Sequence, residues 1–265
     1  MNTVDISTFR ASGHAVARGL LSRHEAASLA DAFMAYPQRG FVPGHFQPSP
    51  QDPDGPYDPL REYPRIMHPH LIDDTAMRCL LDARITSIVG ELIGEEPIAA
   101  QSMLYFKPPG ARGQALHQDN FYLRVEPGTC VAAWVALDEV DRANGGLEVV
   151  PGTHLMDLFC PEEADPDTYF TREYVPPPAG CTRVPVDMAP GDVLFFNGSL
   201  VHGSEPNTTT DRFRRSFVCH YAPRSAERIA RHYRTFTLEG EEVFLAEAQG
   251  GGPCGTEFPV SSSPH

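Results

Sequence analysis

The sequence predicts a mainly β protein with flanking α-helices, built as a jelly-roll-like pair of sheets. After Pro97 the chain consists of short runs rich in β-branched and aromatic residues, separated by turn residues at the spacing of a sandwich or barrel. No long helical pattern interrupts these runs, which argues against a parallel βαβ sheet. Two amphipathic helical patterns lie before Pro97, and we expect these helices to pack outside the sheets.

We expect residues 1–265 to form a single domain in three parts. Residues 1–96 make a helical N-terminal part, which includes a loop at 39–70 rich in Pro, Gly and Asp. Residues 97–223 make the β core, and residues 224–265 make a C-terminal extension that is partly flexible, because its end is rich in Gly and Ser. A hydrophobic fraction of 41% is ample for one continuous core.

The composition argues against several classes of partner. The chain carries 21 Lys and Arg residues against 35 Asp and Glu residues, and its formal net charge of −14 repels nucleic acid and anionic membrane surfaces. No segment approaches the ~18 apolar residues of a membrane span, and the N-terminus lacks a signal-peptide pattern. The six cysteines are scattered without CxxC pairs, so we expect reduced thiols and a cytoplasmic location.

Two helices are expected before the β core. Ser22 followed by Glu25 is the capping-box arrangement that starts a helix. A second pattern begins at Asp74, which can cap it, and ends at Gly94, so we expect one helix across this segment. The apolar residues of the first helix are Ala26, Leu29, Phe33 and Met34.

Seven runs after Pro97 are predicted to be strands, and the second contains a candidate metal site. Because side chains alternate along a strand, His117 and Asp119 should project to one face, with Gln118 on the other. We expect the third ligand to be His202, which is distant in sequence. Two histidines and one carboxylate form the facial triad of non-heme Fe(II) oxygenases. The runs are IAAQSMLYF, GQALHQDNFYL, CVAAWVALDEV, LEVVPGTHL, TRVPVDM, GDVLFFNGSLVHGS and RRSFVCHYAP.

The residues alone leave alternatives open. An HxD tripeptide also arises by chance as two polar residues on one side of a strand, and His154 and His220 are competing third ligands. A dicarboxylic 2-oxo acid needs a cation for its far carboxylate, and Arg supplies a planar fork. Arg214 and Arg215 must point to opposite faces of one strand, so at most one enters the pocket. Both could instead be solvated.

Four segments carry a resemblance to a known family. LHQD, AAWVALDEVDRANGGLEVVPGTH, GDVLFFNGSLVHGSEPN and FRRSFVCHYAP, in this order and spacing, resemble the phytanoyl-CoA dioxygenase family of Fe(II)- and 2-oxoglutarate-dependent oxygenases. The similarity runs from about Arg65 to Pro223. It implies a double-stranded β-helix, a jelly-roll or cupin-like core, in which His117, Asp119 and His202 bind iron and act in catalysis.

The resemblance also implies a pocket for 2-oxoglutarate. It assigns the far carboxylate of this co-substrate to Arg214, helped by Ser204, and places the ring of Trp134 in the pocket wall. Arg65 and Met103 resemble further positions that contact the co-substrate. As the only tryptophan, Trp134 could instead be a plain core residue.

The substrate side is expected to involve Gln101 and the loop at 39–70. Gln101 resembles a pocket-lining position, and the loop offers Arg61 and Tyr63 as part of a candidate lid and substrate reader. The loop could equally be a solvated connector. Lys107 shares a strand face with Gln101 by alternation, but could equally be a solvated strand end.

Together these features predict an iron-dependent dioxygenase that uses 2-oxoglutarate and O2 to hydroxylate a small molecule, with secondary metabolism as an expected setting. Two other functions remain open: a catalytically silent jelly-roll binding or regulatory protein, and a cupin-type metalloenzyme that does not use 2-oxoglutarate. The pair of Arg214 and Ser204 favours the oxygenase, because neither alternative needs it. The substrate and the oligomeric state do not follow from the sequence.

Overall fold

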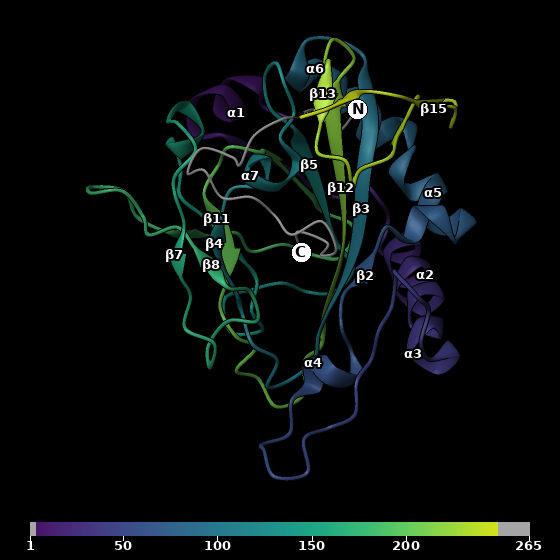
Figure 1. Cartoon of the computed structure of the whole chain (residues 1–265), viewed down its shortest axis with the longest axis vertical. Coiled ribbons are helices and arrows are strands. Elements are labelled where there is room, and N and C mark those ends of the chain that lie inside the picture. The colour runs from purple at the N-terminus through teal and green to yellow at the C-terminus, as the bar shows by residue number, and fades with distance from the viewer. Residues whose placement is uncertain (1–3, 249–265) are drawn as a thin grey trace.

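Two β-sheets face each other, with helices on the outer face of the larger sheet (Figure 1). This computed structural model describes residues 4–248. It confirms the predicted mainly β class with flanking helices in a jelly-roll arrangement. The end of the predicted flexible extension lies outside the described residues.

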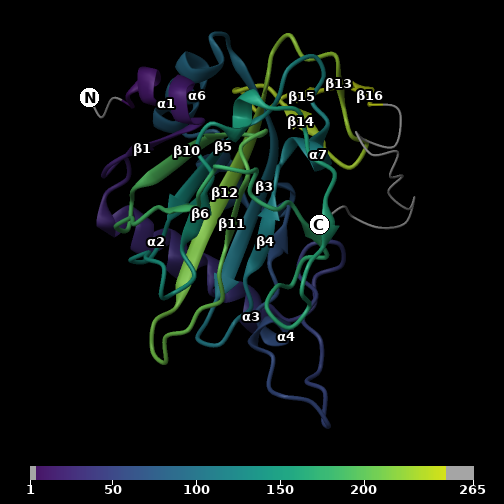
Figure 2. The ribbon, with the colours of Figure 1, turned by 90° about the vertical axis from the view of Figure 1, so that its left-hand side faces the viewer.

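The larger sheet has eight strands in the order β1-β10-β5-β12-β3-β14-β15, with β2 also paired to β3. All its neighbouring strands are antiparallel. The long strands β3 and β12 lie side by side near its middle, as Figure 2 shows. The bounds are β1 His14–Ala17, β2 Ile66–Met67, β3 Pro97–Lys107, β5 Val131–Ala136, β10 Val193–Asn197, β12 Arg214–Pro223, β14 Thr235–Phe236 and β15 Glu242–Val243.

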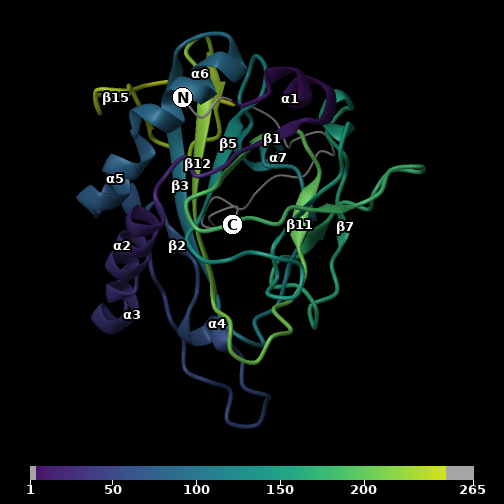
Figure 3. The same cartoon turned by 180° about the vertical axis from the view of Figure 1, so that it is seen from behind.

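The smaller sheet has the order β4-β11-β6-β9 and supplies the opposite wall of the jelly roll. Figure 3 shows this sheet across the molecule from α2 and α5. Two short strand pairs, β7 with β8 and β13 with β16, complete the described structure. The bounds are β4 Gln114–His117, β6 Leu147–Val149, β7 Glu162–Glu163, β8 Glu173–Tyr174, β9 Val184–Pro185, β11 His202–Ser204, β13 Arg228–Ile229 and β16 Ala246–Glu247.

The helices bury apolar side chains against the larger sheet. Phe33 of α2 stacks on Phe217 of β12 with ring centroids 5.2 Å apart, within the largest hydrophobic cluster. In the described part of the chain, no helix has the length and apolar character needed to cross a membrane. The bounds are α1 Ile6–Ser12, α2 Arg23–Phe33, α3 Ala35–Arg39, α4 Pro59–Glu62, α5 Asp74–Leu80, α6 Ala83–Ile93 and α7 Asn120–Leu123, with 3₁₀ turns at Pro69–Leu71 and Thr153–Leu155.

The second predicted helix is in fact two. Asp73, not Asp74, caps α5, and the chain breaks after Leu80 before α6 begins. The Asp82 side chain accepts a hydrogen bond from the backbone N–H of Arg84, so it restarts the helix as a new N-cap. Apolar spacing alone does not show such a break. The predicted end at Gly94 is confirmed, since this residue adopts φ 87°.

Other predicted boundaries also shift. The run GDVLFFNGSLVHGS is two strands, β10 and β11, that belong to different sheets. The loop at 39–70 contains α4 and β2, and residues 224–248 carry four short strands.

Cys79, Cys130, Cys181 and Cys219 are free, but Cys160 is disulfide-bonded, so the expectation that all cysteines are reduced is wrong. Scattered spacing in sequence does not show which sulfur atoms meet in space.

The capping box at the start of α2 is confirmed and gives a stability prediction. Ser22 Oγ accepts from the Glu25 backbone N–H at 3.2 Å, and Glu25 Oε2 accepts from the Ser22 N–H at 2.7 Å. We expect Ser22→Ala to lower the free energy of unfolding by about 1 kcal/mol, because it leaves a helix N–H without its acceptor. Urea unfolding measures this change. Ser28→Ala, on the exposed face of α2, should cost nothing; an equal loss in both variants would rule out the cap as its cause.

Candidate active site

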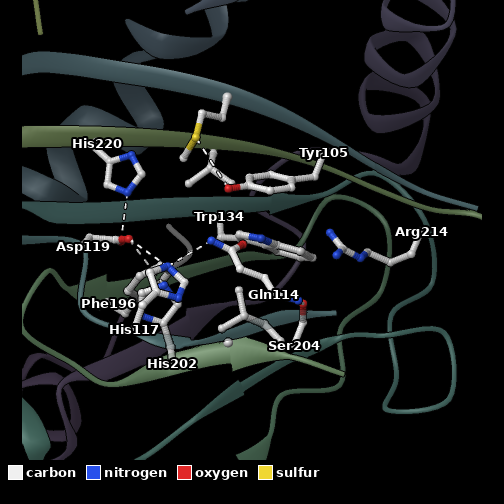
Figure 4. Close-up of a pocket in the computed structure, with 14 residues that line it drawn as sticks. Tyr105, Gln114, His117, Asp119, Trp134, Phe196, His202, Ser204, Arg214 and His220 are labelled. Carbon is white, nitrogen blue, oxygen red and sulfur yellow. Dashed lines mark hydrogen bonds and ion pairs between the residues drawn. The ribbon is translucent and has the colours of Figure 1, made fainter. Parts of the chain in front are cut away.

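Three buried side chains, His117, Asp119 and His202, converge inside the jelly roll. Each offers one ligand atom, and these atoms all lie within 4.8 Å of one another. His117 ends β4 and His202 begins β11, and the two residues are direct partners in the smaller sheet. Sheet pairing therefore brings together two histidines that are distant in sequence, with ring centroids 4.3 Å apart (Figure 4).

The route by which Asp119 reaches this cluster differs from the prediction. The expected strand ends at His117, and Asp119 has helical angles, φ −61° and ψ −36°, at the start of α7. Alternation along a strand is therefore the wrong reason for the convergence. A tight turn into α7, whose first backbone N–H bonds to the Gly198 carbonyl, places the carboxylate beside both imidazoles instead.

Backbone carbonyls fix the tautomers of both histidines. Nδ1 of His117 donates to the Ala115 carbonyl and Nδ1 of His202 donates to the Leu200 carbonyl, each at 2.9 Å. A carbonyl can only accept, so each Nδ1 carries the proton in the neutral ring and each Nε2 presents a lone pair. Burial lowers the pKa of His202 to about 4, which keeps that lone pair free at neutral pH.

The Asp119 carboxylate divides its two oxygens between the cluster and His220. Oδ1 lies 3.3 Å from His117 Nε2 and 3.6 Å from His202 Nε2. Oδ2 accepts a 2.9 Å hydrogen bond from His220 Nε2. Burial alone would raise the pKa of Asp119, but the imidazoles of His202 and His220 and the hydrogen bonds to this carboxylate hold the pKa well below its usual range. The carboxylate is therefore ionised with one oxygen facing the two lone pairs.

The two competing third ligands occupy other places. His220, on β12, is 1% exposed and lines the same pocket, but it contacts the far oxygen of Asp119 and so supports the cluster without being one of its three members. His154 lies in the 3₁₀ turn 153–155, away from the cluster, and its Nε2 bonds to the Arg10 carbonyl. Among the described residues, the structure favours His202 as the third member.

Arg214 lines the same pocket as the three ligand candidates, at its opposite end (Figure 4). It is 3% exposed, its guanidinium lies 5.4 Å from the centre of the Trp134 ring, and one nitrogen donates to Ser216 Oγ. Its buried Nε has no hydrogen-bond partner in residues 4–248. Burial lowers its pKa to about 10, so the side chain remains charged at neutral pH. Arg215 points away and pairs with Asp138 through two nitrogens.

Lys107 is buried beside Arg214 and is not a solvated strand end. It is 2% exposed, and its Nζ donates to Ser204 Oγ and the Glu205 carbonyl at 2.7 Å, and to the Gly145 carbonyl at 3.3 Å. Burial, followed by the charge of Arg214, holds its pKa well below the ordinary value. Because Ser204 Oγ accepts from Lys107, its own hydroxyl proton is free to point into the pocket.

The remaining expected residues fall into four places. Met103 and Trp134 line the pocket that holds the triad and Arg214. Gln101 is fully buried on β3 opposite His220, but it does not line that pocket. Arg65 and Arg61 line an adjacent cavity.

Tyr63 lines neither space. Its ring packs edge-on against Phe106 and Phe213 at the largest hydrophobic cluster.

Several pocket residues were missed from the sequence. Gln114 places its side-chain amide 3.2 Å from His117 Nε2, and Tyr105 lines the pocket with its hydroxyl 3.5 Å from Met103 Sδ. Alternation from Met103 could have identified Tyr105 as a same-face neighbour. Gln114 gave no such signal, because its position depends on the pairing of β4 with β11.

The contact between His220 and Asp119 gives a prediction about metal affinity. We expect His220→Leu to weaken Fe(II) binding about 10- to 100-fold, because the partner that orients the ligand carboxylate is lost. His220→Gln keeps an N–H donor and should retain most of the affinity. Metal titration of the metal-free protein measures both, with His70→Gln, a buried histidine bonded to Ser102, as the control. Equal affinities in wild type and His220→Leu would refute this role.

Comparisons with known proteins agree with this geometry. The family model for phytanoyl-CoA dioxygenase (PhyH) matches residues 9–216. Phytanoyl-CoA dioxygenase 1 of Oryza sativa subsp. japonica is 32% identical over 142 residues, which cover 52% of this chain and 50% of that protein. A probable phytanoyl-CoA dioxygenase of Caenorhabditis elegans is 35% identical over 153 residues, 52% and 47% of the two chains. The chain thus spans about half the length of the curated relatives it matches.

Solved structures resemble most of the described fold. The epimerase SnoN in complex with Fe3+, alpha ketoglutarate and nogalamycin RO has a TM-score of 0.65 and 26% identity, covering 84% of this chain and 83% of that one. EvdO2 from Micromonospora carbonacea var. aurantiaca, complexed with 2-oxoglutarate, has a TM-score of 0.61 and 25% identity, covering 83% and 93%. With a family match across 208 of its 265 residues, this chain belongs to the phytanoyl-CoA dioxygenase family.

Proposed function

We propose that this chain is an Fe(II)- and 2-oxoglutarate-dependent dioxygenase that hydroxylates a small-molecule substrate. The observation that carries the proposal is a single pocket with a His-Asp-His cluster at one end and a buried arginine at the other. Family membership and the iron and 2-oxoglutarate complexes of the structural relatives support it. We further propose that the enzyme acts in secondary metabolism, an inference supported by the nogalamycin ligand of SnoN. The cytoplasmic location expected from the sequence stays a proposal.

The donor set fits iron. His117 and His202 offer neutral Nε2 lone pairs, and Asp119 offers one anionic oxygen; this set of two histidines and one carboxylate is the donor set of non-heme Fe(II) sites. The hydrogen bond from His220 to the other oxygen of Asp119 favours binding through one oxygen only. Three protein ligands leave further coordination positions for the co-substrates.

The pocket also fits a dicarboxylic 2-oxo acid. Arg214 would bind the far carboxylate of 2-oxoglutarate, since its fork suits a carboxylate and its Nε lacks a partner in the described chain. The Ser204 hydroxyl, held by Lys107, would donate to the same group. Trp134 and Met103 would form apolar walls along the carbon chain and exclude water.

The protein would bind and orient the reactants and exclude water, and the bound groups would supply the reactive chemistry. Iron and 2-oxoglutarate, when bound, would supply an oxidation in which O2 and 2-oxoglutarate are consumed, succinate and CO2 are released, and one oxygen atom is inserted into a substrate C–H bond. The buried Arg214 would fix the direction of the co-substrate, because it lines the same pocket as the two histidines. No separate general base is needed in this scheme.

Turnover of 2-oxoglutarate tests the proposal. We expect Fe(II)- and O2-dependent succinate formation, stimulated by a substrate found in a panel of small metabolites. A cupin-type enzyme would act with metal alone, and a silent binding protein would give no succinate. An iron-loaded protein that forms no succinate from 2-oxoglutarate, with or without the panel, contradicts the proposal.

A further inference from the structure

A second cavity of about 440 Å³ lies next to the pocket that contains the metal-ligand candidates. Its lining comes from the loop at 39–70, the end of β3, Arg112 and Phe170. Tyr105 lines both spaces. The volume lies within the 300–1,000 Å³ typical of small-molecule sites.

This cavity is cationic although the chain as a whole carries a formal charge of −14. Its lining includes Arg61, Arg65, Arg112 and Lys107, and a single carboxylate, Asp58. Arg112 already pairs with Asp58 at 2.7 Å, and Lys107 already donates to three acceptors. Arg61 donates to a backbone carbonyl of its own loop. Of these four basic side chains, Arg65 is the one with a buried nitrogen, Nη1, that has no hydrogen-bond acceptor among the described residues.

The Arg65 guanidinium is held in position but not satisfied. It lies 5.4 Å from the centre of the Phe170 ring, and Phe170 in turn lies 6.4 Å, ring to ring, from Tyr105. Stacking on an aromatic face fixes the plane of a guanidinium and leaves its edge free to donate. A buried charged donor without an acceptor is costly, whereas a ligand oxyanion would satisfy it with a bidentate pair of hydrogen bonds.

We propose that this cavity binds the anionic group, a carboxylate or a phosphate, of the substrate through Arg65. The inference rests on the proposed oxygenase function and names the substrate class: an organic acid or phosphate ester that reaches the metal pocket past Tyr105. It also gives Arg65 a role different from the co-substrate contact expected from the resemblance, because Arg65 does not line the pocket that contains Arg214.

Small probes of matched shape test the proposal. Benzoate, phenyl phosphate and neutral benzamide are titrated calorimetrically into the protein loaded with Fe(II) and 2-oxoglutarate without O2. We expect at least one of the two anions to bind and benzamide to bind at least ~10-fold more weakly. The preferred anion distinguishes a carboxylate from a phosphate substrate. Arg65→Gln should weaken anion binding at least ~10-fold.

Arg39→Gln is the matched control, because Arg39 also stacks on an aromatic ring, that of Tyr36, but lies outside the cavity. It should bind the anions like wild type. Equal binding of benzamide, no binding of either anion, or unchanged anion binding in Arg65→Gln would overturn the proposal. So would a loss confined to 2-oxoglutarate binding in Arg65→Gln, which would assign this residue to the co-substrate. The 2-oxoglutarate affinity of wild type, measured in the same experiment, reports separately on the oxygenase function.

Discussion

Replacing Asp119 by alanine is expected to abolish tight Fe(II) binding and all 2-oxoglutarate turnover. The substitution removes the one anionic donor of the cluster and leaves the N–H of His220 without its acceptor. Partners that only orient a ligand are worth about 10- to 100-fold in metal affinity, so loss of the ligand itself should cost more than ~100-fold. Equilibrium dialysis with Fe(II) under anaerobic conditions measures the change.

Asp157→Ala is a suitable control for this experiment, because it removes an exposed carboxylate outside the cluster. Its iron affinity should equal that of wild type. If Asp119→Ala binds iron as tightly as the control, the cluster is not the metal site. Circular dichroism of both variants separates loss of a ligand from loss of the fold.

Replacing Arg214 by glutamine should raise the dissociation constant for 2-oxoglutarate at least ~30-fold, which corresponds to about 2 kcal/mol. The buried guanidinium is the charged group that we propose binds the far carboxylate, and the shorter neutral side chain would leave that carboxylate unpaired. Iron affinity should not change, since Arg214 lies at the other end of the pocket. Titration of 2-oxoglutarate into the iron-loaded protein measures the first change, and equilibrium dialysis with Fe(II) measures the iron affinity.

Arg215→Gln is the neighbouring control. It breaks the ion pair with Asp138 on the opposite face of β12 and should leave the affinity for 2-oxoglutarate near that of wild type. A large effect of Arg215→Gln with none of Arg214→Gln would mean that the strand register is displaced by one residue.

Features that depend on local sequence were predictable. The capping box of Ser22 and Glu25 and the helix end at Gly94 depend on atoms within a few residues, and both are confirmed. The break at Asp82 is also local, but it was missed because the apolar spacing continues across it. A capping side chain such as that of Asp82 is a weaker sequence signal than the hydrophobic pattern around it.

Features that depend on sheet pairing were predictable only in part. The opposite directions of Arg214 and Arg215 follow from alternation, and the structure has this arrangement. The burial of Lys107 depends on acceptors 97 and 98 residues away, and the contact of His220 with Asp119 spans 101 residues. No local pattern specifies such partners, so both residues were left with open alternatives.

The visible spectrum of the anaerobic complex tests the central claim, that the cluster and Arg214 form one site for iron and 2-oxoglutarate. Adding Fe(II), ascorbate and 2-oxoglutarate to the wild-type protein should produce the weak charge-transfer band of a metal-chelated 2-oxo acid. The band should be absent in His117→Ala and should need much more 2-oxoglutarate in Arg214→Gln. No band in the wild-type protein, or an unchanged band in His117→Ala, would contradict this account.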